Sequence, residues 1–262
     1  MKPFQEFPAH LKKEIRFVLA DIDDTLTLEG LLPSASLAAM ERLRDSGMAV
    51  VPVTGRPAGW CDHIARMWPV AAVVGENGAF YFRYDRALRK MQRSYFKTAA
   101  EREADRGRLA EVKAEILAEV PGCAVSADQA FREADLAIDF CEDVPALPPQ
   151  AVVRIVEIFE KAGAQAKISS IHVNGWFGAY DKLAMTRRLF LEVFRQELET
   201  IRDRVIFIGD SPNDQPMFAF FPHAVGVANV REFVNRLSDP PAWVTQRPGG
   251  IGFAEMAATL LS

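Results

Sequence analysis

A short apolar run that ends in a cluster of carboxylates constrains this chain most. Residues 17–20 read Phe-Val-Leu-Ala, and residues 21–25 read Asp-Ile-Asp-Asp-Thr. A run that is apolar at every position is typical of a central parallel strand that is buried on both faces. The carboxylates would then lie at the carboxyl end of that strand, which is the edge where open α/β sheets bind ligands.

The same pattern recurs through the first 80 residues. Apolar runs at 49–53 and 71–74 end in Thr54-Gly55-Arg56-Pro57 and Gly75-Glu76-Asn77-Gly78, and segments with helical spacing separate the runs. Strand, helix, strand, helix and strand joined by short connections are typical of a doubly wound α/β fold. We therefore expect a three-layer core built on a parallel sheet.

The middle of the chain has a different texture. A charge-rich helix is predicted from about Ala99 to Glu119, and residues 134–140 alternate in the manner of a strand with one buried face. The α/β pattern returns near Asp181. We therefore expect a core formed by residues 1–82 and 180–262, with residues 83–179 inserted as an α+β cap domain.

Composition excludes several classes of protein. The chain has 262 residues, of which 49% are hydrophobic, and its net charge of −4 gives no basic excess for binding nucleic acid or anionic membrane. Cys61, Cys123 and Cys141 form no metal-binding or redox pattern, and no segment resembles a signal peptide or a membrane span. We expect a cytoplasmic protein with no nucleic-acid or membrane partner.

Carboxylates from distant parts of the sequence should meet at one edge of the sheet. A later apolar run at 205–208 ends in Gly209-Asp210-Ser211-Pro212-Asn213-Asp214. Parallel strands place their carboxyl ends side by side, so Asp21, Asp23 and Asp210 would converge and repel one another. A hard divalent cation removes that repulsion, and an oxygen-only site suits Mg²⁺ rather than zinc.

The residue types at this edge suit phosphoryl transfer. Asp21 and Asp23 are two positions apart, so on a continuing strand both would point to one face. One carboxylate can attack phosphorus while the other protonates the leaving oxygen and later activates water. Thr54 and Gly55 can donate hydrogen bonds to phosphate oxygens, and a lysine would complete the clamp.

Four segments together resemble the motifs of the haloacid dehalogenase (HAD) superfamily phosphatases. Residues 21–25 are similar to the first motif and residues 54–56 to the second, as found in sugar-phosphate phosphatases of that group. Lys182 is placed like the lysine of the third motif, with Lys167 as the alternative. Residues 209–214 resemble the fourth motif, GDxxND.

The resemblance implies a role for each matched residue. The long gap between Thr54 and Lys182 is similar to the branch that carries a large inserted cap, which includes the Cof-like, sucrose-phosphate and trehalose-6-phosphate phosphatases. The implied roles are a nucleophile at Asp21; an acid/base at Asp23; Mg²⁺ ligands at Asp21, the backbone carbonyl of Asp23 and Asp210; phosphate contacts at Ile22 N–H, Thr54, Gly55, Lys182 and Asn213; and support from Thr25 and Asp214.

The predicted cap offers candidates for substrate recognition. Residues 169–176 read Ser-Ser-Ile-His-Val-Asn-Gly-Trp, and a polar strand end with His172 and Trp176 could contact a sugar. Glu142 and Asp143 follow another predicted cap strand and have a similar claim. Packing and turn formation are equally ordinary uses of Trp and Asn at such a strand end. For Arg56, a helix-start or surface role is as consistent with the sequence as a role in the site.

Three functions remain open at this level. The leading expectation is a phosphatase that hydrolyses a small phosphorylated metabolite, with a sugar phosphate implied by the resemblance. A phosphotransferase or mutase on the same scaffold would pass the phosphoryl group to a sugar hydroxyl instead of water. A phosphoaspartate signalling receiver also uses acidic strand ends, a threonine and a lysine, but it needs no cap and no second acid/base at Asp23.

Overall fold

A six-stranded sheet forms the centre of the larger part of the molecule. The computed structural model describes residues 1–169 and 171–262. All neighbouring strands of this sheet pair in parallel. Their order is β1 (Lys2–Pro3), β13 (Trp243–Val244), β12 (Val225–Gly226), β11 (Val205–Gly209), β2 (Phe17–Ala20) and β3 (Ala49–Pro52).

The two faces of the sheet carry separate hydrophobic clusters. Every residue of β2 and β11 is buried. Successive side chains of β2 alternate between clusters, so that Val18 packs on one side and Leu19 on the other. The first cluster includes side chains from α2 (Ser34–Asp45), α3 (Ala58–Met67) and α9 (Gly249–Leu260). The second includes side chains from α6 (Lys182–Leu189), α7 (Leu198–Ile201) and α8 (Gln215–Phe220). The short helix α1 (Ala9–Lys12) lies near the N-terminus.

A three-stranded antiparallel sheet extends the core at the β3 side. It consists of β4 (Val73–Gly75), β5 (Phe80–Asp85) and β6 (Lys90–Tyr95), and a parallel bridge between Val53 and Val74 connects β4 to the region of β3. Residues 83–85 and 90–92, at the start of the predicted insertion, therefore form a hairpin that continues the sheet of β4.

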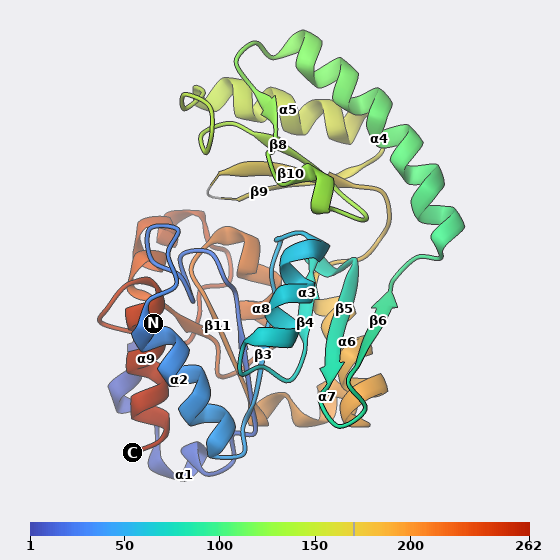
Figure 1. The fold of residues 1–262 in the computed structure, drawn as a ribbon. Coiled ribbons are helices and arrows are strands. Elements are labelled where there is room, and N and C mark those ends of the chain that lie inside the picture. The colour runs from blue at the N-terminus through green and yellow to red at the C-terminus, as the bar shows by residue number, and fades with distance from the viewer. Residues whose placement is uncertain (170) are drawn as a thin grey trace.

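A second layered unit lies above the main sheet (Figure 1). The predicted charged helix is present as α4 (Ala99–Glu119), and it packs beside α5 (Pro149–Lys161) on one face of a four-stranded antiparallel sheet. That sheet has the order β7 (Ala124–Val125), β8 (Leu136–Asp139), β10 (His172–Trp176) and β9 (Gln165–Ile168). The prediction of a doubly wound parallel core with an added α+β cap is confirmed.

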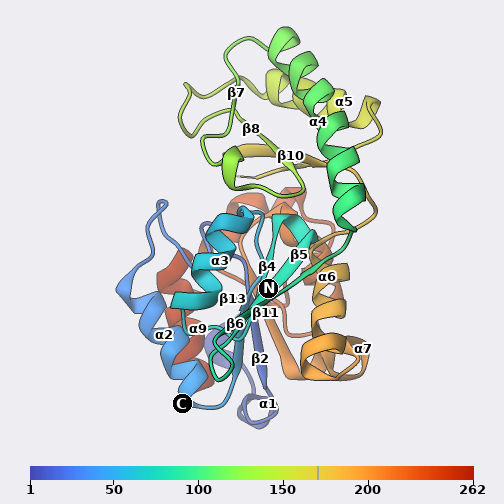
Figure 2. The same ribbon diagram turned by 45° about the vertical axis from the view of Figure 1, so that its right-hand side comes forward.

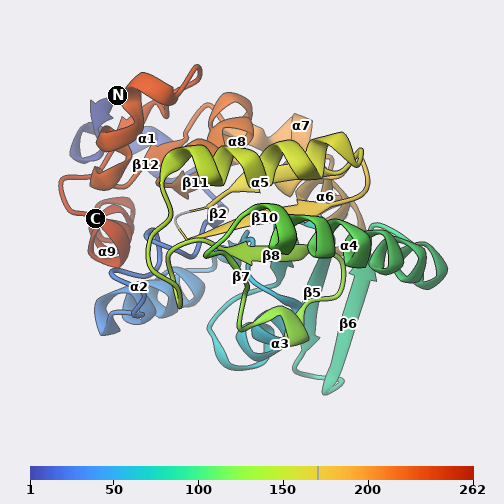
Figure 3. The ribbon, with the colours of Figure 1, turned by 90° about the horizontal axis from the view of Figure 1, so that it is seen from above.

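Side chains alternate between the two faces of each cap strand, and this alternation determines which of them face the core. Ile138 and Val173 pack with α4 and α5, so their neighbours His172 and Asn174 lie on the opposite face. That face is turned toward the carboxyl ends of the core strands, as Figures 2 and 3 show from two further directions. Within residues 1–169 and 171–262, no helix is long and apolar enough to cross a lipid bilayer.

Candidate active site

A buried lysine joins two of the predicted acidic residues. Lys182 Nζ lies 2.6 Å from Asp21 Oδ1 and 2.8 Å from Asp214 Oδ1. Lys182 is the first residue of α6, and Asp181 caps that helix by accepting a hydrogen bond from Ala184 N–H. Lys182, rather than Lys167, is therefore the lysine placed beside Asp21.

A glycine allows the chain to pass close to this lysine. Gly78, at the end of the 3-10 turn η2 (Glu76–Gly78), has a φ of +106°. A Cβ at Gly78 would lie 2.0 Å from the carbonyl oxygen of Asp181. Only glycine fits both the backbone conformation and the space, so the turn after β4 can abut the start of α6.

Three carboxylates from two strand ends gather around one point. Ligand oxygens of Asp21, Asp210 and Asp214 all lie within 4.8 Å of one another. Asp214 Oδ2 accepts a hydrogen bond from Asp210 N–H at 3.1 Å, and Thr25 Oγ1 donates to Asp210 Oδ1 at 3.3 Å. The predicted convergence of β2 and β11 is thus present in the structure.

The charges of this cluster do not balance. Burial raises the pKa of Asp21 to about 7, with Lys182 opposing the shift and Asp214 and Asp23 adding to it. Burial, followed by repulsion from Asp214 and Asp21, raises the pKa of Asp210 well above its ordinary value. One ammonium faces three buried carboxylates. An all-oxygen donor set with excess negative charge fits a hard divalent cation.

The predicted acid/base carboxylate is paired with an arginine. Arg56 Nε lies 3.0 and 3.1 Å from the two carboxylate oxygens of Asp23, and Arg56 Nη2 lies 2.8 Å from Oδ1. Sequence reasoning left Arg56 undecided between a surface and a site residue, and the structure places it in the site. The signal available was its position directly after Thr54-Gly55, at a strand end.

The predicted phosphate-binding residues lie at different depths. Gly55 and Asn213 line a cavity of about 750 Å³ together with Asp21 and Asp23. Thr54 is fully buried, and its Oγ1 accepts a hydrogen bond from the backbone N–H of Arg56. The side chain of Ile22 belongs to the core cluster on one face of the sheet, which leaves only its backbone as a possible ligand.

The cap forms the opposite wall of this cavity. Arg132, Phe140, His172 and Asn174 line it from the inserted unit. Trp176 does not reach the cavity: its indole N–H donates to Tyr180 O at 3.3 Å and its ring stacks on Tyr180. Of the predicted segment 169–176, Ser170 lies outside the described residues.

His172 is buried and neutral in this wall. Its Nε2 lies 2.9 Å from Glu142 Oε2, but the contact is not aligned as a hydrogen bond. Burial, and then the positive charge of Arg132, lower the pKa of His172 to about 4. This imidazole nitrogen is buried and has no hydrogen-bond partner among the described residues, and the residue belongs to the cavity wall.

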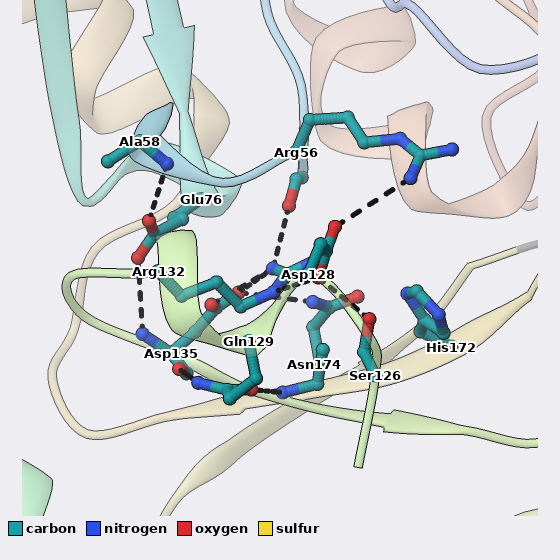
Figure 4. A network of polar contacts seen from close by, with 12 residues as sticks. Arg56, Ala58, Glu76, Ser126, Asp128, Gln129, Arg132, Asp135, His172 and Asn174 are labelled. Carbon is teal, nitrogen blue, oxygen red and sulfur yellow. Dashed lines mark hydrogen bonds and ion pairs between the residues drawn. The ribbon is translucent and has the colours of Figure 1, made fainter. Parts of the chain in front are cut away.

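A polar network that sequence reasoning missed joins the cap to the core (Figure 4). The carboxylate of Glu76 is fully buried and accepts hydrogen bonds from the backbone N–H groups of Ala58 in the core and of residues 133–135 in the cap. Arg132 Nη1 donates to the carbonyl oxygen of Gly55 at 3.1 Å. Neither contact has a local sequence signal, because both partners are set by the packing of the cap on the core.

Comparisons with known proteins agree with this arrangement. Residues 18–103 match the family model described as haloacid dehalogenase-like hydrolase. No curated protein sequence matches the chain significantly. The family match supports the prediction of an enzyme, namely a hydrolase.

Solved structures share the fold over nearly the whole chain. The Thermoplasma acidophilum protein 0175 is 18% identical with a TM-score of 0.73, and the match covers 94% of this chain and 98% of that one. The sucrose-phosphatase of Synechocystis, in complex with sucrose and phosphate, is 15% identical with a TM-score of 0.65, covering 94% and 97%. A trehalose-6-phosphate phosphatase related protein is 17% identical with a TM-score of 0.61, covering 94% and 95%. The predicted resemblance is therefore confirmed: this chain is similar to the haloacid dehalogenase-like hydrolases in sequence over residues 18–103 and in fold over nearly its whole length.

Proposed function

We propose that the protein is a Mg²⁺-dependent phosphatase that hydrolyses a phosphate monoester through a phosphoaspartate on Asp21. The observation that carries the proposal is the contact of Lys182 with Asp21 and Asp214 beside the unbalanced acidic cluster. A buried carboxylate with a fixed cation at its side is suited to attack an anionic phosphorus centre. Asp21 and Asp210, with the backbone carbonyl of Asp23, would hold Mg²⁺, which neutralises charge on the phosphate when it is bound.

Each of the remaining site residues has a defined role beside the nucleophile. Asp21 attacks phosphorus, and Lys182 stabilises the charge that develops on the phosphoryl oxygens. Gly55 and Asn213 contact those oxygens from the cavity wall, with Thr54 and the backbone N–H of Ile22 as further donors. Asp214 holds Lys182 in place, and Thr25 supports Asp210.

Asp23 acts as general acid in the first half of the reaction and as general base in the second. It gives a proton to the departing oxygen of the ester when the bond to phosphorus breaks. As a carboxylate, it then accepts a proton from the water that attacks the phosphoaspartate. Phosphate leaves, and Asp21 is free again.

The cap supplies the leaving-group side of the site. We propose that residues 1–82 and 180–262 form the catalytic core and that residues 83–179 form the inserted unit. The first hairpin of the inserted unit continues the sheet of β4, so the part that covers the cavity begins with α4.

The cavity of about 750 Å³ accommodates a small phosphorylated metabolite. Sucrose-phosphatase and the trehalose-6-phosphate phosphatase related protein among the structural neighbours favour a sugar phosphate.

The experiment is a turnover assay with p-nitrophenyl phosphate in the presence of Mg²⁺ or EDTA. We expect hydrolysis with Mg²⁺, none with EDTA, and a loss of at least about 10⁴-fold in Asp21→Asn, whose fold should be unchanged. Retained turnover in Asp21→Asn contradicts the assignment of the nucleophile. Phosphate release in the absence of an acceptor distinguishes a hydrolase from a phosphotransferase, and repeated turnover distinguishes it from a receiver that keeps its phosphoryl group.

A further inference from the structure

We propose that Arg56 is a positioning residue that couples the cap to the acid/base carboxylate: it holds Asp23 in the state described here and moves to Glu142 of the cap when the cap closes on substrate. The inference rests on the proposed function, because it gives a use to Asp23 as the proton donor. It adds a step to that function, namely the release of Asp23.

The ion pair between Arg56 and Asp23 involves both carboxylate oxygens of Asp23. Nε reaches Oδ1 and Oδ2 at 3.0 and 3.1 Å, and Nη2 reaches Oδ1 at 2.8 Å. Such forked pairs of arginine and carboxylate are among the strongest side-chain hydrogen bonds. A proton on either oxygen of Asp23 would compete with the N–H groups of Arg56, so we infer that Asp23 donates to a leaving oxygen after the fork opens.

The far edge of the same guanidinium faces two cap carboxylates. Arg56 Nη1 lies 3.8 Å from Asp128 Oδ2 and 3.8 Å from Glu142 Oε1, beyond hydrogen-bond distance but within reach of a small shift. Figure 4 shows the guanidinium directed toward Asp128, above the cap loop that carries Arg132. Three carboxylates, one from the core and two from the cap, thus compete for one cation.

Glu142 is the open acceptor of the two cap carboxylates. Asp128 is already bound by Arg132 through Nε at 2.9 Å and Nη2 at 3.1 Å, and by Ser126 Oγ at 2.7 Å. The side chain of Glu142 is 35% exposed, and its close neighbour His172 is uncharged. A closer, hydrogen-bonded ion pair with Arg56 therefore breaks no other charged pair at Glu142.

The surroundings of Arg56 favour a sliding movement. Its guanidinium carbon lies 4.5 Å from the centre of the Trp60 ring, a flat surface that attracts a cation without fixing its direction. The cap also touches the neighbouring residue, since Arg132 donates to the carbonyl oxygen of Gly55. A shift of the cap loop is therefore transmitted to the segment that carries Arg56.

The test compares two substrates of similar shape that differ in how much they need the proton. The p-nitrophenolate of p-nitrophenyl phosphate leaves readily without protonation, whereas the phenolate of phenyl phosphate, with a parent pKa near 10, depends more on the acid. The measured quantity is the ratio of kcat/KM for phenyl phosphate to kcat/KM for p-nitrophenyl phosphate.

In Glu142→Gln, the cap offers Arg56 a neutral amide in place of an open carboxylate, so Arg56 stays on Asp23 and we expect the ratio to fall by about tenfold or more. Adding Arg56→Gln to Glu142→Gln removes the ion pair with Asp23, and the ratio should return to within about threefold of the wild-type value. Asp143→Asn, a change in the exposed neighbouring carboxylate, is the matched control and should leave the ratio unchanged.

Three results would overturn the proposal: equal losses on both substrates in Glu142→Gln, no recovery in the double variant, or the same effect in Asp143→Asn. A wild type that does not hydrolyse p-nitrophenyl phosphate, or an active Asp21→Asn, contradicts the proposed function itself and is recognised separately.

A crystal structure of the wild type with Mg²⁺ and tungstate gives a readout without turnover. We expect Arg56 within about 3.2 Å of Glu142 and detached from Asp23. A retained Arg56–Asp23 fork overturns the coupling.

Discussion

Lys182 Nζ lies 2.6 Å from Asp21 Oδ1, although 161 positions separate the two residues in the chain. The contact depends on β2 and α6 meeting at one edge of the main sheet. Both groups are buried, so each depends on the other for its charge. Burial works against the ammonium, but Asp21 and Asp214 outweigh it and raise the pKa of Lys182.

Removing this ammonium should harm both stability and activity. In Lys182→Met, Asp21 and Asp214 lose their counter-charge, and we expect the free energy of unfolding without metal to fall by about 3 kcal/mol. Turnover should fall by at least about 10²-fold because charge on the phosphoryl oxygens is no longer stabilised. Urea unfolding and steady-state kinetics measure the two effects. The control is Lys167→Met in the exposed part of β9, and a larger loss of turnover there would reverse the assignment of the lysine.

Mg²⁺ should stabilise the folded protein through the acidic cluster. At a hundredfold excess over its dissociation constant, a ligand that binds only the native state adds about 2.7 kcal/mol. We expect a rise in Tm with MgCl₂ that Asp210→Asn loses and that Asp203→Asn, in an exposed turn, retains. The pKa of Asp21 is raised to about 7, so protons compete with the cation and the rise in Tm should grow between pH 5 and pH 8. A rise of equal size in Asp210→Asn would place the cation elsewhere.

The buried His172 should make the protein less stable in acid. Its pKa is about 4 in the folded protein and about 6.5 when exposed. The unfolded chain therefore binds the proton first, and the contribution to stability that is present above pH 6.5 is lost as the pH falls toward 4. His172→Gln should reduce the slope of unfolding free energy against pH in this window by up to about 1.4 kcal/mol per pH unit. Chemical denaturation at several pH values measures it, and an unchanged slope would show that His172 is protonated in the folded state.

Two residues predicted to select the sugar should behave differently. His172 lines the cavity, so His172→Gln should change the relative rates across a panel of phosphorylated metabolites. Trp176→Phe removes a hydrogen bond to Tyr180 O outside the cavity, so it should cost about 1 kcal/mol of stability and leave the order of substrates unchanged. A changed order in Trp176→Phe would return that residue to the specificity site.

A methyl group at Gly209 should disrupt the acidic cluster. A Cβ there would lie 2.3 Å from Asp214 Oδ2, which accepts the backbone N–H of Asp210. Gly209→Ala should therefore displace Asp214 and lower both turnover and stability, with a loss of about 1–3 kcal/mol. Gly107→Ala, at an open position within α4, is the control and should be neutral or slightly stabilising. Thermal unfolding and kinetics on both variants decide the matter.

Local patterns in the sequence were enough to predict the core and the residues at its edge. Continuous apolar runs are compatible with strands buried on both faces, and the geometry of a parallel sheet brings the carboxyl ends of these strands together. Asp21 and Asp210 were therefore predicted to meet at one edge of the sheet, with Asp214 in a supporting role, whereas the carboxylate of Asp23 is paired with Arg56. The helix 99–119 was equally predictable, because its length and composition are local properties of the chain.

The way the cap meets that edge depends on packing between segments that are distant in sequence. Glu76 directly follows a predicted strand, and its carboxylate accepts hydrogen bonds from three backbone N–H groups of the cap loop. Arg56 is forked onto Asp23, and Trp176 is turned into the core instead of the cavity. The contacts of Glu76 and Trp176 depend on the relative placement of two separately formed sheets, whereas the Arg56–Asp23 fork joins the ends of β3 and β2 within the core. Periodicity and motif spacing describe each sheet alone, whereas the contacts between them arise from side chains that are distant in sequence and carry no local pattern.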